Sequence, residues 1–227
     1  MGEAEMLKGS GQLIIHSVFY FYGEAATVDL CRQITADISA YWNEPRASVR
    51  IKKSQFDLYF DIRGFCEPKL PSEAVWYNTN PRFNFFRIED FSSNHISFVD
   101  GIKSNTGYFK LDNLANKSTT AAHEYGHTLG LEHPSLLDIR GAGQPGIMYP
   151  RGTICDPCFQ YDANARPLDP GGTLNPFTRK VLASDIEDLH LEKLPFNKTG
   201  LAIIGGFSSI YHPKHLPDSS QLTGELV

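Results

Sequence analysis

The sequence predicts an α+β fold, and three observations support that prediction. The segment from Leu13 to Tyr22 is rich in β-branched and aromatic residues, as expected of a strand buried on both faces. Residues 26–42 place their apolar side chains at helical spacing, and a second helix is expected from Ser118 through Gly130. Between these helices, short apolar segments alternate with turn residues, which is typical of a sheet.

The first elements follow from the local sequence. Residues 1–11 are polar and contain glycine, so we expect a frayed arm. The strand at 13–22 is followed by a turn at Gly23. The helix after it is expected to bury one stripe of side chains: Val28, Cys31, Ile34, Ile38, Tyr41 and Trp42. Pro45 lies just past the end of that helix.

The later elements are shorter and less regular. Strands are expected at 48–51, 56–65, 85–88, 95–99 and 108–111. Residues 134–177 are rich in glycine and proline, and a coil this long is usually functional or disordered. A capping box at Ser184–Glu187 starts a last helix, which is expected to end near Lys193. We expect residues 196–227, with His212 and His215, to form a solvated tail of unknown role.

The composition fits one globular domain. The chain has 227 residues, of which 41% are hydrophobic and 21% charged, and this excludes a largely disordered, collagen-like or coiled-coil chain. Because 21 basic residues stand against 26 acidic ones, the net charge is −5, whereas nucleic-acid-binding proteins usually carry a basic surplus. The longest apolar stretch near the start is about half of the ~20 residues that a membrane-spanning helix needs. We expect a monomer with no nucleic-acid partner and no membrane span.

The most informative stretch is His123-Glu-Tyr-Gly-His127-Thr-Leu-Gly130-Leu-Glu-His133. Residues four apart lie on one helix face, so His123 and His127 can direct two imidazole nitrogens at one cation. Glu124 directly follows His123, and from there its carboxylate can reach a water on that cation without being a ligand. At Gly130 the helix can end in a left-handed conformation, and the chain then returns with His133 as a third ligand. Three nitrogens and an open fourth position are typical of a catalytic zinc site.

The spacing of this motif makes a chance origin implausible. The HExxH pattern alone is expected by chance in about 3% of chains of this length. Adding Gly130 and His133 lowers that frequency to roughly one in ten thousand. Three imidazole ligands suit zinc best, although cobalt or nickel can also occupy such a site.

A methionine downstream of the histidine motif is the second feature that points to a protein family. Met148 lies 15 residues after His133, within a Gly-Ile-Met-Tyr-Pro segment. HExxHxxGxxH followed by such a methionine resembles the metzincin clan of zinc endopeptidases. That resemblance implies that the three histidines bind zinc, that Glu124 is the general base and that Met148 lies in a turn beneath the metal.

The resemblance also implies a metzincin-like zincin fold within residues 1–195. A mixed, twisted sheet with two long helices would form an upper subdomain at about 12–133. A coil-rich lower subdomain with a C-terminal helix would follow at about 134–195. An extended peptide would bind an edge strand, at 95–99 or 108–111, by strand addition.

The resemblance further assigns a substrate pocket to the residues after the methionine. Tyr149, Pro150 and Arg151 would line the pocket for the side chain that follows the cut. Arg151 either favours an acidic or polar group there or is solvated, which is the more common state of an arginine. Met148-Tyr149-Pro150 resembles the matrixins, whereas Pro134 after the third histidine resembles the serralysins. A structural calcium ion is compatible with the resemblance, but the residues give no support for it.

A zinc-dependent endopeptidase is the leading functional hypothesis. Its substrate would be a protein or peptide, cut by a zinc-activated water with Glu124 as base. A narrow-target effector or toxin protease is the second hypothesis, and it predicts no cleavage of general substrates. A non-catalytic zinc-binding module is the third, and Glu124 argues against it because a binding site needs no base.

The sequence leaves the compartment and the cysteine chemistry open. The first residues lack a signal-peptide pattern, so we expect the chain to be cytosolic, a mature form with its leader removed or a domain of a longer precursor. We expect it to act outside the producing cell, after secretion or delivery. Cys155 and Cys158 form a CxxC pair, but a zinc site needs two further ligands. Disulfides and free thiols are both compatible with this pair and with Cys31 and Cys66.

Overall fold

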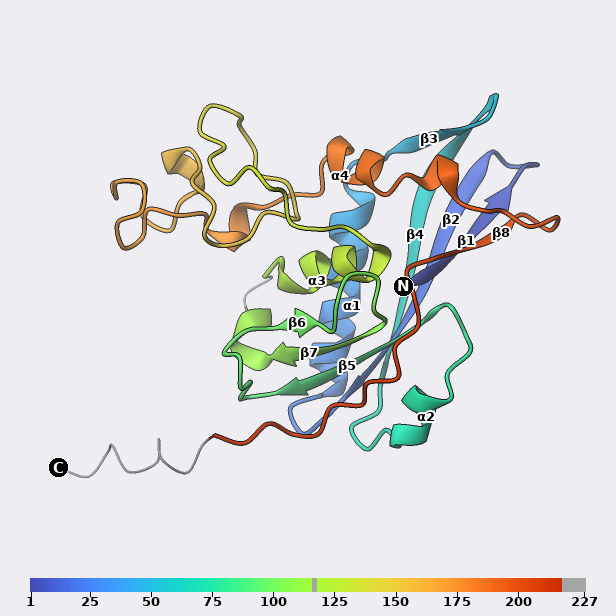
Figure 1. The fold of residues 1–227 in the computed structure, drawn as a ribbon, viewed down its shortest axis with the longest axis horizontal. Helices are drawn as coiled ribbons and strands as arrows, with labels where there is room; N and C mark the ends of the chain where they lie inside the picture. Colours follow the sequence, from blue (N-terminus) through green and yellow to red (C-terminus); the bar gives the residue numbers. More distant parts are fainter. Residues whose placement is uncertain (116–117, 218–227) are drawn as a thin grey trace.

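The computed structural model describes residues 1–115 and 118–217 of the chain. Those residues form one mixed sheet of eight strands, with helices packed against it (Figure 1). The strands are β1 (Gly2–Leu7), β2 (Gln12–Tyr22), β3 (Ser48–Ile51), β4 (Ser54–Cys66), β5 (Phe83–Glu89), β6 (Phe98–Val99), β7 (Thr106–Lys110) and β8 (Leu201–Ile204). The helices are α1 (Val28–Asn43), α2 (Ser72–Trp76), α3 (Thr120–Leu129) and α4 (Ala183–Asp188). The α+β class predicted from the sequence is confirmed.

Strand β2 lies inside the sheet, as predicted, but the expectation that it is buried on both faces is wrong, because alternate residues such as Ile14, His16 and Val18 are only half-buried. The strand order is β3-β4-β2-β5-β7-β6, and β1 pairs with both β2 and β8 beside this path. The first half of β2 pairs antiparallel with β1, its second half pairs parallel with β5, and its other edge pairs parallel with β4. Strand β6 ends the path and runs antiparallel to β7. Strand β7 is therefore internal, whereas β6 is an edge strand.

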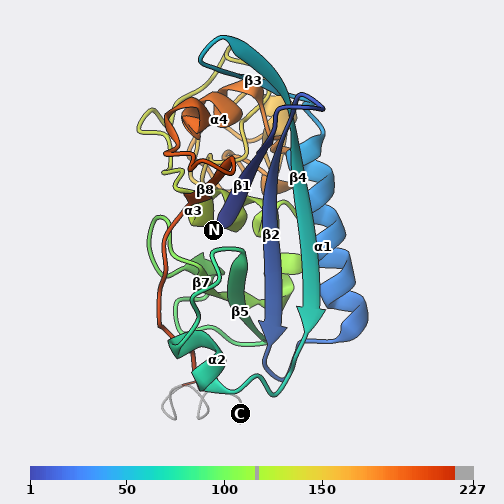
Figure 2. The same cartoon turned by 90° about the vertical axis from the view of Figure 1, so that its right-hand side faces the viewer.

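Helix α1 covers one face of the sheet beside β4, as Figure 2 shows. The Thr27 hydroxyl caps its start by accepting the Leu30 N–H at 3.3 Å. Its buried face consists of Cys31, Ile34, Ile38 and Trp42. Val28, which the predicted stripe included, is 61% exposed in the first turn, so the buried stripe is narrower than predicted.

Helix α3 is anchored to the core by Tyr125, which is fully buried. The Tyr125 hydroxyl lies 2.7 Å from the Ser17 hydroxyl on β2. Its ring contacts three aromatic side chains at centroid distances of 5.5 to 6.3 Å: Phe19, Trp42 and Phe60. Because large aromatic side chains dominate core energetics, these contacts fix the position of α3 against both the sheet and α1.

The expectation of a frayed arm at residues 1–11 is wrong. Strand β1 pairs with β2 on one side and with β8 on the other, and Met1 and Ala4 are fully buried. Pairing on both sides satisfies the backbone groups that a frayed arm would leave to water. The strand is built largely from glycine, alanine and glutamate, and residues of these types are depleted in strands. Its composition therefore could not predict it.

The expectation of a solvated tail is wrong for residues 201–215. Strand β8 belongs to the sheet. His212 is 9% exposed and donates through Nε2 to Asp100 at 2.8 Å. The His215 ring stacks on Tyr108 with a centroid distance of 4.1 Å. These partners are about a hundred positions away, so the local sequence could not reveal them. Residues 218–227 of the predicted tail lie outside the described residues.

The lower part of the chain is coil-rich, as predicted. Between 134 and 177, the structure has turns and a 3-10 helix at Pro157–Phe159. This segment lies on the other side of α3 from β6 and β7 (Figure 1). The last helix is shorter than predicted, because α4 ends at Asp188 and a separate 3-10 turn follows at Leu191–Lys193. Its cap also differs, since Asp185 accepts the Leu182 N–H at 2.7 Å.

In the part of the chain that the structure describes, no helix has both the length and the apolarity needed to cross a bilayer.

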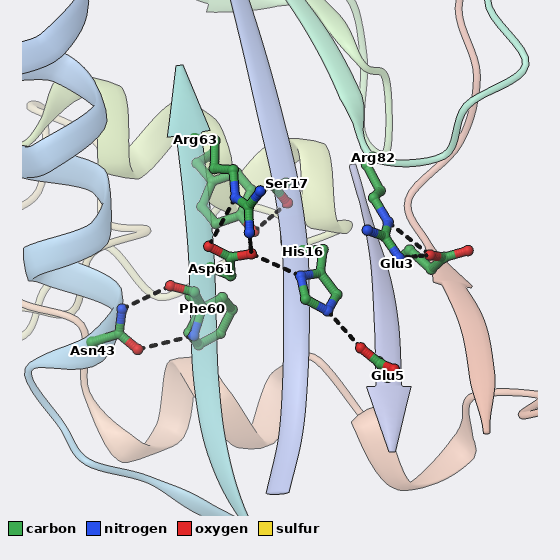
Figure 3. Close-up of polar contacts among 10 residues, drawn as sticks. Glu3, Glu5, His16, Ser17, Asn43, Phe60, Asp61, Arg63 and Arg82 are labelled. Atoms are coloured by element: carbon green, nitrogen blue, oxygen red, sulfur yellow. Dashed lines mark hydrogen bonds and ion pairs between the residues drawn. The ribbon is translucent and has the colours of Figure 1, made fainter. Parts of the chain in front are cut away.

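A polar cluster links three strands on the face of the sheet away from α1 (Figure 3). His16 on β2 donates through Nδ1 to Asp61 on β4 at 2.9 Å, and its Nε2 lies 2.9 Å from a carboxylate oxygen of Glu5 on β1. Arg63 also donates to Asp61, at 3.0 Å. Burial acts to raise the pKa of Asp61, but the hydrogen bonds from His16 and Arg63 outweigh it and hold that pKa below its ordinary value of 3.8.

We predict that Asp61→Asn destabilises the protein at neutral pH but not in acid. Because the folded-state pKa lies below the unfolded one, the carboxylate stabilises the fold above about pH 4, and this contribution is lost as the pH falls through the folded-state pKa. The expected loss at neutral pH is about 1–2 kcal/mol. Urea unfolding at neutral pH and in acid measures it, with Asp57→Asn at an exposed position of the same strand as control. An equal loss under both conditions would contradict the role of the charge.

Candidate metal centre

Helix α3 carries the first half of the predicted motif. His123 and His127 lie four residues apart on one face of the helix, and both are buried. The helix ends at Gly130, whose φ of 112° lies in the left-handed region that favours glycine. The chain turns there and brings His133 back to the same face, so the predicted helix, turn and third histidine are all present.

The three imidazole rings converge on one point. The Nε2 atom of His133 lies 3.0 Å from that of His123 and 3.1 Å from that of His127. His123 donates through Nδ1 to the Ile147 carbonyl at 2.8 Å, and His127 donates through Nδ1 to the Leu131 carbonyl at 2.7 Å. A neutral imidazole that donates through Nδ1 has a lone pair on Nε2. Two lone pairs therefore face His133, whose single Nε2 can direct a proton toward only one of them.

A bound cation fits this arrangement better than hydrogen bonds among the histidines. Ligands at 2.0–2.1 Å from a tetrahedral metal lie about 3.3 Å from one another, close to the observed Nε2 separations. The candidate ligand atoms of the three histidines all lie within 4.8 Å of one another. Burial lowers the pKa of His127 to about 4 and also lowers the pKa of His123 and of His133. All three are therefore neutral near pH 7, and neutral imidazole is the form that binds a metal.

Met148 lies in a turn directly against α3. Its side chain is 2% exposed, and Gly126 leaves room for it, because a Cβ at position 126 would lie 2.3 Å from the Met148 sulfur. The same turn supplies the Ile147 carbonyl that accepts the His123 N–H. Asp185 of α4 accepts the Ile147 N–H at 3.3 Å. The turn is thus held between α3 and α4, and it orients one of the histidines.

The histidines open onto a cleft of about 440 Å³. Glu124 also lines this cleft and is 6% exposed. Burial raises the pKa of Glu124 to about 8, against the opposing effects of the Arg179 charge and a hydrogen bond from the Val99 backbone. Further lining comes from the β6 region and from the lower part of the chain: Phe98, Val99, Ile102, Pro150, Arg151 and Arg179.

Two of the three predicted pocket residues line the cleft. Pro150 does so, and so does Arg151, which is exposed. The Tyr149 ring instead packs against a small apolar cluster formed by Ile139, Cys155 and Leu174. Tyr149 contributes through its backbone, because its carbonyl accepts a hydrogen bond from Arg179 at 2.9 Å.

Arg179 is a cleft residue that the sequence did not reveal. Its side chain is 4% exposed. It donates through Nε to the Thr119 hydroxyl at 2.9 Å, and its Nη1 lies 2.9 Å from His123 Nδ1. Arg179 follows a 3-10 turn at Pro176–Thr178 and precedes α4. In sequence, an arginine in such a loop cannot be distinguished from a solvated one.

No second metal site is found within residues 1–115 and 118–217. The three histidines are the group of His, Cys, Asp and Glu side chains there that could hold an ion. The four cysteines are free thiols, and Cys155 and Cys158 are not part of such a group. The described residues thus give a structural calcium ion no support either.

Comparisons with known proteins add no relatives to this description. No protein-family model matches the chain, and no curated protein matches it. The interpretation of the site therefore depends on its geometry.

We predict that the chain binds one zinc ion and that each histidine is required. His127→Ala removes one of three ligands and is expected to weaken zinc binding on the order of 100-fold or more. Competition with a chromophoric chelator measures the affinity. His190→Asn is the matched control, because His190 is exposed and its left-handed φ of 49° is tolerated by asparagine. Equal zinc affinities of the two variants would contradict the assigned site.

We also predict that Gly126 and Met148 are energetically coupled. Gly126→Ala forces a methyl group against the methionine sulfur and is expected to cost about 1–3 kcal/mol of stability. Met148→Ala removes the obstacle, so the double variant should be less destabilised than the sum of the two single variants. Urea unfolding of all four proteins gives the coupling energy. Strict additivity would show that the two side chains do not compete for space.

Proposed function

We propose that the protein is a zinc-dependent endopeptidase of the metzincin type. The observation that carries this proposal is the convergence of three imidazole Nε2 atoms in one cleft together with the buried Glu124. Three protein nitrogens leave one position of a tetrahedral ion for water and substrate, as in catalytic zinc sites. A structural zinc site would use four protein ligands, and no fourth belongs to this group in the described part of the chain.

His123, His127 and His133 are the residues that would hold the zinc ion. When bound, zinc supplies Lewis acidity, which lowers the pKa of a coordinated water toward ~7 and polarises a carbonyl group. The carbonyls of Ile147 and Leu131 keep two of the rings in the tautomer that ligation requires.

Glu124 is the residue proposed to move the proton. In this proposal it accepts a proton from the attacking water and then delivers it to the leaving amine, so it acts first as base and then as acid. Its place in the cleft, one residue from His123 but outside the ligand group, supports this role. The presence of Glu124 in the cleft also argues against a module that only binds zinc, because such a module needs no base.

Strand β6 is proposed to bind the backbone of the substrate. It ends the strand path and pairs with β7. The backbone groups of an edge strand can pair with an extended peptide. Phe98 and Val99 of β6 line the cleft beside the histidines. Of the two candidate segments, 108–111 overlaps the internal strand β7, so the β6 segment is the one that the sheet order favours.

The fold is compatible with the metzincin resemblance in three respects. The sheet is mixed, α1 and α3 pack against each other, and a methionine turn lies against the helix that carries two histidines. These features support the proposal because each of them positions a residue of the site.

We predict that the zinc-loaded protein cleaves peptides and that Glu124→Gln abolishes cleavage while zinc stays bound. Loss of a general base is expected to lower the rate about 100-fold or more. Cleavage of a peptide library from a denatured proteome, read by mass spectrometry, measures this. Glu132→Gln is the matched control, because Glu132 lies in the same motif but is exposed.

Two results would contradict this proposal in different ways. Cuts that persist in Glu124→Gln would remove Glu124 from the mechanism. No cuts despite one bound zinc ion per chain would rule out a general endopeptidase and favour a protease with one narrow protein target.

A further inference from the structure

The cleft contains a buried positive charge whose bonded partners are neutral. Arg179 is 4% exposed and lines the cleft. The groups that the described residues offer it are a hydroxyl at Thr119, a carbonyl at Tyr149 and the imidazole of His123. Burying a charge is costly unless an ion of opposite charge is paired with it. The charge of Glu124 attracts Arg179 and acts to raise its pKa, but these two described residues do not form an ion pair.

The Arg179 guanidinium also has unused donors. Arginine carries five N–H groups, of which Nε–H is used by Thr119 and one Nη1–H by Tyr149. When His123 donates its Nδ1–H to Ile147, that nitrogen has no lone pair left to accept from Arg179. Nη1 is enclosed by the Tyr149 carbonyl and the His123 ring, so the two Nη2–H groups are the donors left without an acceptor among residues 1–115 and 118–217. Charged N–H donors of this kind form short, strong hydrogen bonds with a carboxylate.

A second arginine adds positive charge to the same cleft. Arg151 is exposed, lines the cleft and repels Arg179, which contributes with burial to lowering the pKa of Arg179 to about 10. Among the described residues that line the cleft, Glu124 is the acidic one. Two guanidinium groups against one carboxylate leave the cleft with an excess of positive charge, which favours an anionic ligand.

We infer that Arg179 determines specificity by binding a carboxylate of the peptide substrate inside the cleft. This inference rests on the proposed peptidase function and names its substrate class: peptides with an acidic group at one fixed position relative to the cut bond. The carboxylate comes from an aspartate or glutamate side chain, or from the C-terminus of the peptide. Arg179 contributes the Nη2–H donors and Arg151 adds attraction from the solvent side.

A purely structural role for Arg179 makes a different prediction. Its bonds to Thr119 and Tyr149 connect the start of α3 to the segment after the methionine turn. If this connection were its whole role, substitution would lower stability and leave the preference for acidic peptides unchanged. The charge preference therefore separates the two roles.

Peptide binding to a non-cleaving protein tests the inference. The protein is zinc-loaded Glu124→Gln, and the probes are six-residue alanine peptides in which one glutamate or one glutamine occupies each position in turn. All are blocked at both ends, and the glutamine set is also made with a free C-terminal carboxylate. Calorimetry measures each affinity, and we expect a preference of about 10-fold or more for one carboxylate source at one position.

Variants assign that preference to Arg179. Arg179→Gln in the same background should abolish the preference, whereas Arg166→Gln, at an exposed arginine of the lower segment, should keep it. Arg179→Lys keeps the charge but lacks the planar guanidinium and its fixed Nη2–H donors, so it should reduce the preference. This variant provides a test if Arg179→Gln fails to fold. Equal affinities for acidic and amide peptides, or a preference that survives Arg179→Lys undiminished, would overturn the inference.

The inference and the proposed function fail separately. Cleavage by the native protein with no acidic residue enriched at any position would overturn the inference and leave the peptidase function standing. A carboxylate preference in binding without any cleavage would support Arg179 as the binding residue and contradict a general endopeptidase function.

Discussion

Two backbone carbonyls determine where the lone pairs of the candidate metal centre point. Each accepts an Nδ1–H, the Ile147 carbonyl from His123 and the Leu131 carbonyl from His127, and so directs an Nε2 lone pair toward His133. Neither carbonyl lies in a regular helix or strand: one belongs to the methionine turn and the other to the reversal after Gly130. The site therefore depends on two irregular segments being held as firmly as α3 itself.

Packing holds these segments in place from several directions. The Trp42 indole of α1 donates to the Ala122 carbonyl at 3.0 Å, and Tyr125 fastens the same helix to the sheet. Gly126 lets the methionine turn approach α3 closely, and Asp185 holds the turn from α4. A well-packed interior transmits small displacements, so a change at any of these contacts is expected to move a ring nitrogen.

The sequence predicts the parts of this site that are local. Spacing alone places His123 and His127 on one helix face, and Gly130 marks the turn that returns His133, because helix periodicity and left-handed glycine are local properties. The central strand at 13–22 follows equally from its own composition. The structure therefore shares the histidine-bearing helix, the turn at Gly130 and the central strand with the prediction.

The parts that the sequence missed depend on distant partners. Strand β1 is stabilised by β2 and β8 rather than by its own residues, and His212 is buried by Asp100 and its neighbours. Arg179 becomes a cleft residue only because Thr119 and Tyr149 hold it there. Pairing across a sheet and burial of a charged side chain are decided by tertiary contacts, which override local propensity. The excess of positive charge in the cleft became visible only once the fold was known.

X-ray absorption at the zinc edge of the zinc-loaded protein tests the central claim most directly. The account predicts three imidazole nitrogens and one further light atom at about 2.0–2.1 Å, with no sulfur ligand. Sulfur scattering at about 2.3 Å would place the metal at the cysteines instead and contradict the account. A spectrum without imidazole scattering around the zinc ion would also contradict the account, because the three histidines would then not be its ligands.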